Sequence, residues 1–154
     1  MAREKTVQDL IDCDQLVRLS PLSTVIQASR EMLRHHIGAV VVVDDAERTV
    51  GILTERDINT RVVAAEHDPA TTLLSDVMTP SPTLLPSDTK VSDALRWVVR
   101  NKYRYALIGQ NQKAAGIVVI SRIFAEVTMI LGSNVEEIDH FIRGDVGSDH
   151  QALN

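Results

Sequence analysis

The 154-residue sequence has little of several features that mark specialised classes of protein. Cys13 is its one cysteine, so no internal disulfide can form, which is typical of a reducing compartment. Aromatic residues make up 3% of the chain, too few for the stacking platforms of single-strand nucleic-acid binders. The longest apolar run, residues 37–43, is too short to cross a membrane, and no apolar signal region follows the N-terminus. These absences predict a cytoplasmic protein that has no membrane partner.

Basic charge and catalytic motifs are also scarce. The 16 Lys and Arg residues against 21 Asp and Glu residues give a net charge of −5, so the surface repels nucleic-acid backbones. The sequence contains no glycine-rich phosphate loop, no activated nucleophile and no Cys/His spacing of a zinc site. His35 and His36 would point about 100° apart on a helix, which makes them poor joint ligands. We therefore expect no enzyme, no metal site, no required cofactor and no nucleic-acid partner.

What the chain does have is an internal duplication. Residues 19–24, 25–28 and 50–53 recur as residues 84–89, 91–94 and 115–118. The offset is 65 or 66 residues, which predicts two copies of one supersecondary unit packed on each other. Neither copy alone is expected to bury its apolar face, because each is too small to enclose a core.

Each copy is predicted to run β-α-β-β-α. The strands are expected at 17–19, 39–43 and 50–53 in the first copy, and at 83–85, 105–108 and 115–118 in the second. Ser23 or Thr24 would cap the first helix, and Thr89 the equivalent helix of the second copy. Their apolar stripes are Val25, Ala28, Met32 and Leu33, and then Val91, Ala94, Leu95, Val98 and Val99. The expected fold class is α/β (α+β), with the two repeats related by pseudo-twofold symmetry.

Two motifs lie inside this duplicated frame. Residues 51–57 read Gly-Ile-Leu-Thr-Glu-Arg-Asp, and residues 75–80 read Ser-Asp-Val-Met-Thr-Pro. They resemble, respectively, the Gly-apolar-x-Thr/Ser-x-x-Asp segment and the repeat entry of tandem CBS-domain proteins, also called Bateman modules. The resemblance covers residues 7–144. It implies a stand-alone pair without a catalytic domain, which binds an adenine nucleotide or dinucleotide between its repeats and regulates a partner.

The expected organisation has six segments. They are an N-terminal segment 1–16, CBS repeat 1 at 17–66, a linker 67–82, CBS repeat 2 at 83–131, an amphipathic helix 132–144 and a disordered tail 145–154. The N-terminal segment could form a helix whose apolar edge is Val7, Leu10 and Ile11. The linker is expected to hold one short turn, at 73–78.

The resemblance assigns ligand contacts chiefly to the first repeat. Asp57 would accept hydrogen bonds from both ribose hydroxyls, and the Thr54 hydroxyl would reach the ribose or a phosphate. The alternative is that these two residues only form a capping box at a helix start. The sequence leaves both interpretations open, and the two roles are compatible. The remaining candidates are Ile37, Gly38 and Ala39 beside the adenine, Leu19 and Ser20 in the same pocket, and Arg56, Lys102 and Arg104 near the phosphates.

For each of these remaining residues a plainer interpretation stays open. Gly38 would then be an ordinary turn glycine, and the basic residues would be solvated surface charges. The second repeat departs from the motif, because it has Val119 at the hydroxyl position and Arg122 at the carboxylate position. Val119 cannot bond a ribose hydroxyl, and Arg122 cannot accept from one. We therefore predict one competent nucleoside site, with Arg122 contacting a phosphate tail or pairing with an acid.

The favoured hypothesis is a sensor of AMP, ADP, ATP or an NADH-like dinucleotide that acts on a partner protein which the sequence does not name. One alternative is a dimerisation or interaction scaffold whose nucleotide sites have decayed. Another is a sensor of a metal or an S-adenosyl compound. We also expect a homodimer, because each repeat would expose an apolar helical face. These faces are Ile58, Val62 and Val63, and Phe124, Val127 and Ile130.

Overall fold

The computed structural model describes residues 3–11 and 16–132. Within them the protein is mixed α+β, with two small sheets and five α-helices, so the expected fold class is confirmed. The helix expected at 132–144 and the tail expected at 145–154 fall, from residue 133 onward, outside the described residues.

The elements follow the expected order, with additions. They are η1 (Val7–Leu10), β1 (Arg18–Leu19), α1 (Val25–His35), β2 (Ala39–Val43), β3 (Thr49–Thr54), α2 (Glu55–Ile58), η3 (Asn59–Val63), α3 (Leu74–Val77), β4 (Thr79–Pro80), β5 (Leu84–Leu85), α4 (Val91–Asn101), β6 (Tyr105–Gln110), β7 (Lys113–Val119) and α5 (Ile120–Leu131). Both copies of the β-α-β-β-α run are therefore present.

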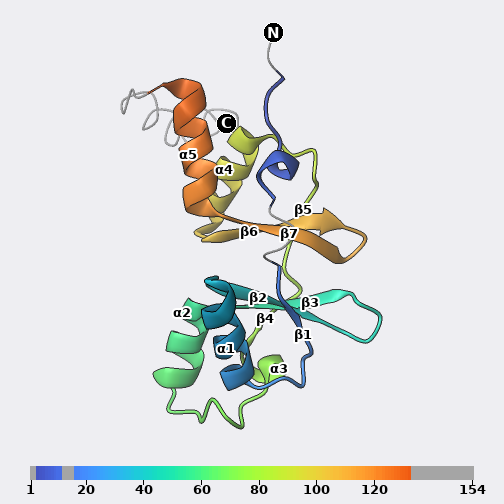
Figure 1. Cartoon of the computed structure of the whole chain (residues 1–154), viewed down its shortest axis with the longest axis vertical. Helices are drawn as coiled ribbons and strands as arrows, with labels where there is room; N and C mark the ends of the chain where they lie inside the picture. The colour runs from blue at the N-terminus through green and yellow to red at the C-terminus, as the bar shows by residue number, and fades with distance from the viewer. Residues whose placement is uncertain (1–2, 12–15, 133–154) are drawn as a thin grey trace, which may run out of the picture. The chain divides into compact units, whose positions relative to one another are not determined.

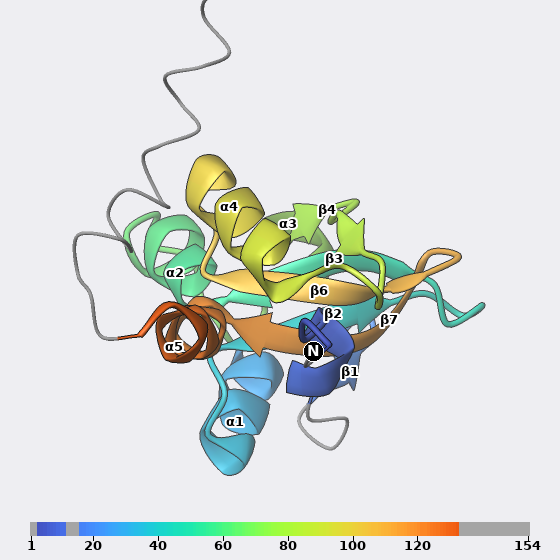
Figure 2. The same ribbon diagram turned by 90° about the horizontal axis from the view of Figure 1, so that it is seen from above.

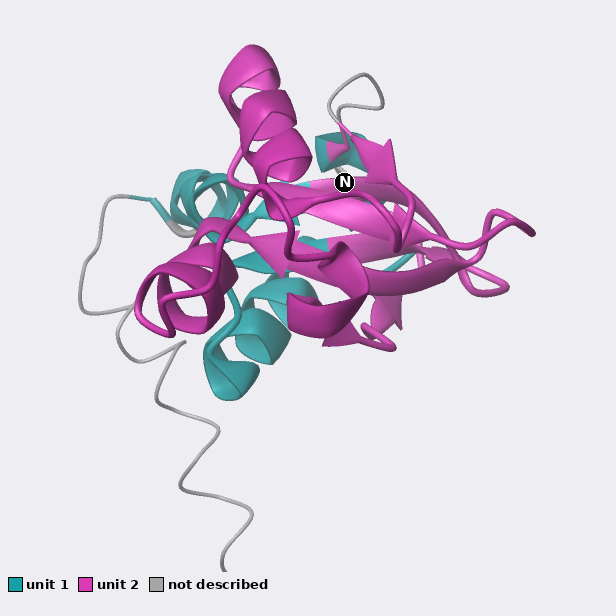
Figure 3. Ribbon diagram, turned by 90° about the horizontal axis from the view of Figure 1, so that it is seen from below, with its two compact units in different colours: residues 1–10, 88–106, 118–154 teal, residues 11–87, 107–117 magenta. Residues whose placement is uncertain are grey.

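The chain divides into two compact units that interleave along the sequence (Figure 3). Unit 1 holds the described residues of 1–10, 88–106 and 118–154, and unit 2 holds those of 11–87 and 107–117. The turn end of the β6–β7 hairpin therefore groups with the first repeat, whereas the N-terminal residues group with the second. This exchange between repeats is not visible in the duplication.

The first sheet of unit 2 has the strand order β1-β2-β3-β4. β1 runs parallel to β2, and the other neighbours are antiparallel. β2 is a run of small and β-branched residues that is buried almost throughout, as expected for a strand covered on both faces. The core beside it contains Val25, Ala28, Met32, Val40, Val42, Leu53, Val62, Leu74 and Val77.

Helix α1 shows which cap and which stripe the sequence specifies. Thr24 is the N-cap, because its hydroxyl accepts from the Gln27 N–H at 3.4 Å and the Gln27 side chain accepts from the Thr24 N–H at 2.9 Å. Val25, Ala28 and Met32 are buried as predicted. The placement of Leu33 in the stripe is wrong, since its side chain is 77% exposed. It follows Met32 by one residue, which turns it about 100° away from the core side.

The linker contributes more than the predicted short turn. After α3, strand β4 pairs with β3, so that Pro80 lies opposite Gly51 and Thr79 opposite Ile52. The Met78 side chain lies against Gly51, where a Cβ atom would collide with it. A two-residue strand that contains proline has no periodic pattern, so nothing in the sequence indicates this fourth strand.

A second sheet, in the order β5-β6-β7, shares a small apolar cluster with the first inside unit 2. The cluster consists of Leu16, Val41, Leu107 and Ala114. Thr49 adds polar contacts, because its N–H donates to the Gln112 carbonyl at 2.7 Å and its hydroxyl accepts from the Ala114 N–H at 2.9 Å. Arg18 donates to the Ala114 carbonyl at 3.1 Å. These contacts explain why 107–117 groups with the first repeat.

In unit 1, helices α4 and α5 pack on each other, and η1 packs against α5 (Figures 1 and 2). The N-terminal segment forms a 3-10 turn with Val7 and Leu10 buried, as part of the expected apolar edge. Its backbone is also hydrogen-bonded to the chain at the start of α4. The Val7 N–H donates to the Thr89 carbonyl at 2.9 Å, and the Val91 N–H donates to the Lys5 carbonyl at 3.1 Å.

The predicted cap of α4 is wrong. The N-cap is Lys90, and no side chain caps the helix, since the N-terminal segment supplies the acceptor for the Val91 N–H. Val91, Ala94, Leu95 and Val98 are buried as predicted, whereas Val99 is exposed.

Two residues expected on exposed dimer-forming faces, Val62 and Val127, are instead buried within their own units.

Candidate nucleotide site at the start of helix α2

Two reciprocal hydrogen bonds close the start of α2. The Thr54 hydroxyl accepts from the Asp57 N–H at 3.2 Å, and Asp57 Oδ2 accepts from the Thr54 N–H at 3.0 Å. This is the capping box that the sequence offered as one interpretation. It arises because an extended residue with a hydroxyl precedes the helix, and a carboxylate stands at the third helical position.

Asp57 keeps acceptor capacity beyond the cap. Its side chain is 15% exposed, and Oδ1 lies 3.7 Å from Arg61 Nη2. Arg61 is itself held by a hydrogen bond of 2.9 Å from Nη1 to the Val77 carbonyl. Because each carboxylate oxygen has two lone pairs, Asp57 can still accept from the hydroxyls of a ligand. The box therefore orients the carboxylate and uses one of its acceptor positions, while the others stay available.

Residues 37–39 lie at the same end of the sheet. Ala39 pairs with Thr54 across β2 and β3, and the Gly38 carbonyl accepts from the Glu55 N–H at 3.0 Å. The chain thus passes the start of α2 just before it enters the buried strand. The structure brings these three predicted residues together with the capping box.

Leu19 and Ser20 lie toward the other end of β2. The parallel pairing sets Leu19 beside Val42, three residues and about 10 Å along the strand from Ala39. The Ser20 hydroxyl accepts from the Leu22 N–H at 3.2 Å, which closes the turn before α1. The structure does not bring these two candidates to the start of α2.

A hollow of about 410 Å³ opens between α1 and α2. Its lining is Ser29, Met32, Leu33, His36, Ile37, Glu55 and Ile58. Glu55 is the first residue of α2, so the hollow and the capping box share one helical turn. The walls are mainly apolar, and they also include a hydroxyl, an imidazole and a carboxylate. We call this cavity the α1–α2 hollow.

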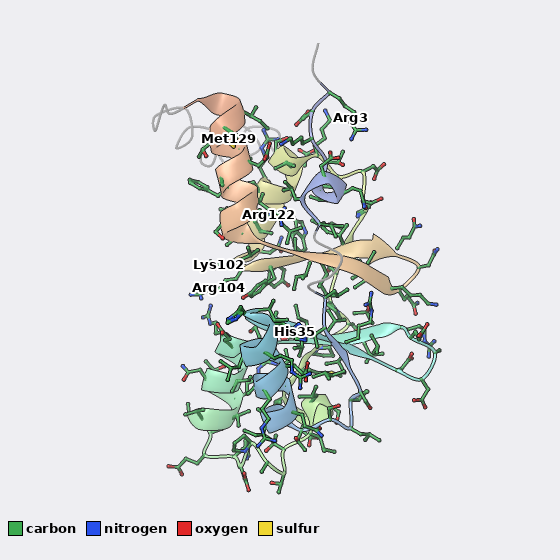
Figure 4. All side chains as sticks on the ribbon, viewed as in Figure 1. Arg3, His35, Lys102, Arg104, Arg122 and Met129 are labelled. Atoms are coloured by element: carbon green, nitrogen blue, oxygen red, sulfur yellow. The ribbon has the colours of Figure 1, made fainter. Side chains whose placement is uncertain are left out.

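The basic candidates divide between the two units. Arg56 is exposed on α2 of unit 2. In unit 1, the Arg104 carbonyl accepts from the Ile120 N–H at 2.7 Å, which places Arg104 beside the first residue of α5. Lys102 ends α4 in a left-handed conformation two residues earlier, and Arg122 lies in the first turn of α5 (Figure 4). Three cations therefore gather at the start of α5.

The start of α5 corresponds to the start of α2 but has no capping box. Val119 is its N-cap, and no side-chain hydrogen bond is made there. Arg122 stands three residues later, where α2 has Asp57. The predicted equivalence of these positions is confirmed, and so is the absence of a carboxylate and a hydroxyl at the second helix start.

Comparison with known proteins agrees with this duplicated geometry. A family model for the CBS domain matches residues 7–64 and again residues 74–128. The chain belongs to the CBS-domain family. Its two CBS domains lie in tandem, as the motifs predicted.

A CBS relative from Acidianus ambivalens, an uncharacterised 17.7 kDa protein, is 37% identical over 125 residues, which cover 78% of this chain and 74% of the relative. The Arabidopsis thaliana CBS domain-containing protein CBSCBSPB2 is 32% identical, and the match spans 22% of its length. An uncharacterised conserved protein from Pyrococcus horikoshii has a TM-score of 0.74 at 24% identity, covering 82% of this chain and 95% of that one. CBSX2, solved in complex with AMP, has a TM-score of 0.67 at 22% identity, covering 82% and 98%. The structural likenesses support the CBS-pair fold.

One residue beside the capping box of α2 was missed by the sequence analysis. Arg61 faces Asp57 and ties it to the end of α3. The four-residue spacing from an acid to a following arginine could have indicated this pair.

Within 3–11 and 16–132, no helix is long and apolar enough to cross a membrane. Nor do three or more His, Cys, Asp or Glu side chains of these residues gather as metal ligands.

Proposed function

We propose that this CBS pair is a regulatory module that binds one adenine nucleotide at the start of α2. The observation that carries the proposal is the Asp57 carboxylate, which is fixed by its capping box and retains free acceptors. A ribose presents two adjacent hydroxyl donors, which suit such a carboxylate. The AMP complex of CBSX2, a protein of the same fold, supports adenine nucleotides as the ligand class.

The other contacts follow from the chain around this carboxylate. Backbone groups of residues 37–39 would read the adenine edge, because they lie beside the first turn of α2. The N-terminus of the helix and the nearby Arg56 would favour the phosphates. Lys102, Arg104 and Arg122 remain candidates for a longer phosphate tail. Leu19 and Ser20 are the weakest candidates, since the sheet register separates them from Asp57.

The regulatory mechanism is a population shift. A ligand that binds one arrangement of the pair more tightly than another increases the population of that arrangement. The change would be transmitted to a partner protein through a homodimer of the pair. The absence of a capping box at α5 limits the expected stoichiometry to one nucleotide per chain.

The test is calorimetric titration of the purified chain with AMP, ADP, ATP and NADH. Asp57→Ala should weaken binding by roughly tenfold to a hundredfold, since hydrogen bonds to a charged group contribute about 1.5–3 kcal/mol. Asp93→Ala is the matched control, because Asp93 also lies in the first turn of a helix but far along the chain from the site. Equal affinity of the Asp57→Ala variant and the wild type would contradict the assignment.

The second candidate function is an interaction scaffold, which the altered start of α5 favours. A scaffold would bind none of the four nucleotides in its wild-type form, yet it would still dimerise. Including zinc and S-adenosylmethionine in the same titrations tests the remaining ligand classes. If zinc or S-adenosylmethionine gives a binding signal and none of the four nucleotides does, the result would favour a sensor of a metal or of an S-adenosyl compound.

A further inference from the structure

The Arg61 side chain bridges the carboxylate of the candidate nucleotide site and the end of α3. It belongs to η3, a π-helical turn in which the Ala64 N–H donates to the Asn59 carbonyl at 2.9 Å. Turns of this kind are rare and often occur at functional sites. Arg61 Nη1 donates to the Val77 carbonyl at 2.9 Å, and Nη2 lies 3.7 Å from Asp57 Oδ1. One guanidinium therefore has partners on two separate segments of the chain.

The two contacts of Arg61 differ in kind. The bond to Val77 has the length of a direct hydrogen bond, and it satisfies a carbonyl of the last turn of α3, which has no partner within a helix. The distance to Asp57 is longer than a hydrogen bond, so this contact is an ion pair. It is screened from water, because the Asp57 side chain is 15% exposed. Arg61 is thus anchored at α3 and orients the carboxylate without occupying its lone pairs.

The same two segments also pack through apolar side chains. Val62, which follows Arg61, is fully buried in a core cluster that includes Leu74 and Val77 of α3. After α3 the chain forms β4, which pairs with β3 two and three residues before Thr54. These contacts form a closed ring that runs from the capping box through Arg61 to α3, and through β4 back to β3. A displacement of α3 would consequently displace the side chain that faces the carboxylate.

We infer that Arg61 is a positioning residue that links nucleotide binding at Asp57 to the segment 74–80. The inference rests on the proposed nucleotide site and adds a means of regulating it. A ribose binds best when the carboxylate is held in its capped orientation, and in that orientation Arg61 reaches Val77. Bound nucleotide therefore stabilises this arrangement of the segment, and whatever stabilises the segment raises the nucleotide affinity in return.

The test uses Arg61→Met, which removes the charge and every donor but keeps an unbranched apolar stem. The ligand is whichever of AMP, ADP, ATP and NADH binds the wild type most tightly in calorimetric titration. This nucleotide should bind the variant about fivefold or more weakly, the lower end of the coupling measured between linked sites. Thermal melting checks that the variant is folded, as the 44% exposure of the Arg61 side chain predicts.

Amide hydrogen exchange, measured by NMR, reports on the segment itself. In the wild type, saturation with the nucleotide should slow the exchange of residues 74–80. The saturated Arg61→Met variant should show no such slowing. Without nucleotide, the Met78 N–H, which donates to the Leu74 carbonyl at 2.8 Å, should exchange faster in the variant than in the wild type.

A conservative variant and a matched control separate positioning from general effects of charge. Arg61→Lys keeps the charge but lacks the planar fork, so it should recover part of the affinity and less of the slowed exchange. Arg34→Met is the matched control, because Arg34 pairs with Glu31 at 3.4 Å within one helix. It should leave the affinity and the nucleotide-dependent exchange of residues 74–80 unchanged.

The outcomes distinguish this inference from the proposed function. If Arg61→Met binds the nucleotide as tightly as the wild type while Asp57→Ala binds it weakly, the site stands and the inference is overturned. Weaker binding by Arg61→Met with an unchanged slowing of exchange also overturns it, because Arg61 would then act on the carboxylate alone. A wild type that binds none of the four nucleotides contradicts the proposed function, and the inference with it.

Discussion

The two CBS domains build the same backbone around different helix starts. His36 and Lys102 both adopt left-handed conformations, with φ of 53° and 58°, at equivalent helix ends. Gly38 and Arg104 then both offer a carbonyl to the first N–H of the following helix, at 3.0 and 2.7 Å. The backbone is therefore maintained by apolar packing and main-chain bonds. The side chains at the helix start are free to differ, and they decide whether a carboxylate is presented.

The largest expected effect is on the free energy of unfolding, at a pair of equivalent glycines in the two domains. The Met78 side chain packs against Gly51, and the Ile11 side chain packs against Gly116. Replacing either glycine by alanine should lower the free energy of unfolding by about 1–3 kcal/mol, because the added methyl group overpacks the contact. The loss should be larger at Gly116, since isoleucine is stiffer than methionine. Urea denaturation measures both.

The control for the glycine prediction shortens the opposing side chain. Ile11→Ala in the Gly116→Ala background should recover part of the lost stability, because it removes the atoms that the new methyl group meets. Strict additivity of the two losses would show that the contact between residues 11 and 116 is not the cause.

The helix caps provide the next prediction. Thr54→Val should lower stability by about 1 kcal/mol, because the first turn of α2 loses its hydroxyl acceptor. Thr24→Val is a matched case, since Thr24 forms the same kind of box at α1. Val119→Ala at the uncapped helix should change stability much less. A similar loss at residues 54 and 119 would contradict the importance of the cap.

The next variant introduces the Thr54 and Asp57 side chains of α2 at the equivalent positions of α5, and so tests whether they account for the difference between the two domains. The double variant Val119→Thr, Arg122→Asp should raise stability by about 0.5 kcal/mol by adding a capping box to α5. In calorimetric titration with AMP it should also take up more nucleotide per chain than the wild type does. If stability rises and the stoichiometry is unchanged, the second domain lacks a base pocket rather than a ribose acceptor.

The smallest expected effect is on the pH dependence of stability, and it involves the turns of the β2–β3 and β6–β7 hairpins. In the first, Asp44 accepts from the Arg48 N–H, from Arg48 Nε and from the Ala46 N–H, and these bonds hold the pKa of Asp44 below its ordinary value of 3.8. A lowered pKa stabilises the fold above pH 3.8, and this contribution disappears as the pH falls through the folded-state pKa. Asp44→Asn should therefore be slightly less stable than the wild type at pH 7 and equal to it in strong acid.

The equivalent second turn has no such carboxylate. Asn111 and Gln112 adopt left-handed conformations there, with φ of 52° and 61°. Gln112→Ala should consequently show no stability difference that depends on pH between about pH 3 and 7, measured by thermal melting. A pH-dependent difference at residue 112 would show that groups other than Asp44 control the acid response.

Much of the fold could be predicted from local pattern. The apolar run 39–43 became β2 with the same bounds, and the stripe of α1 was right at three of four positions because burial recurs with helical period. The Thr54–Asp57 box was also readable, since it uses residues three positions apart. Other errors arose where a distant segment intervened. The backbone of residues 5–7 displaced the expected Thr89 cap, and the linker supplied an unexpected strand beside β3.

The sequence by itself determined the duplicated β-α-β-β-α pattern, the family and the hydroxyl and carboxylate at the start of α2, because all of these depend on short spacings. The tertiary structure alone decided that Arg61 braces Asp57, that Leu19 and Ser20 lie away from it, and that the β6–β7 turn groups with the first repeat. These facts depend on strand register and on contacts between residues tens of positions apart. Local pattern carries no information about such contacts, because chain entropy and long-range packing select them together.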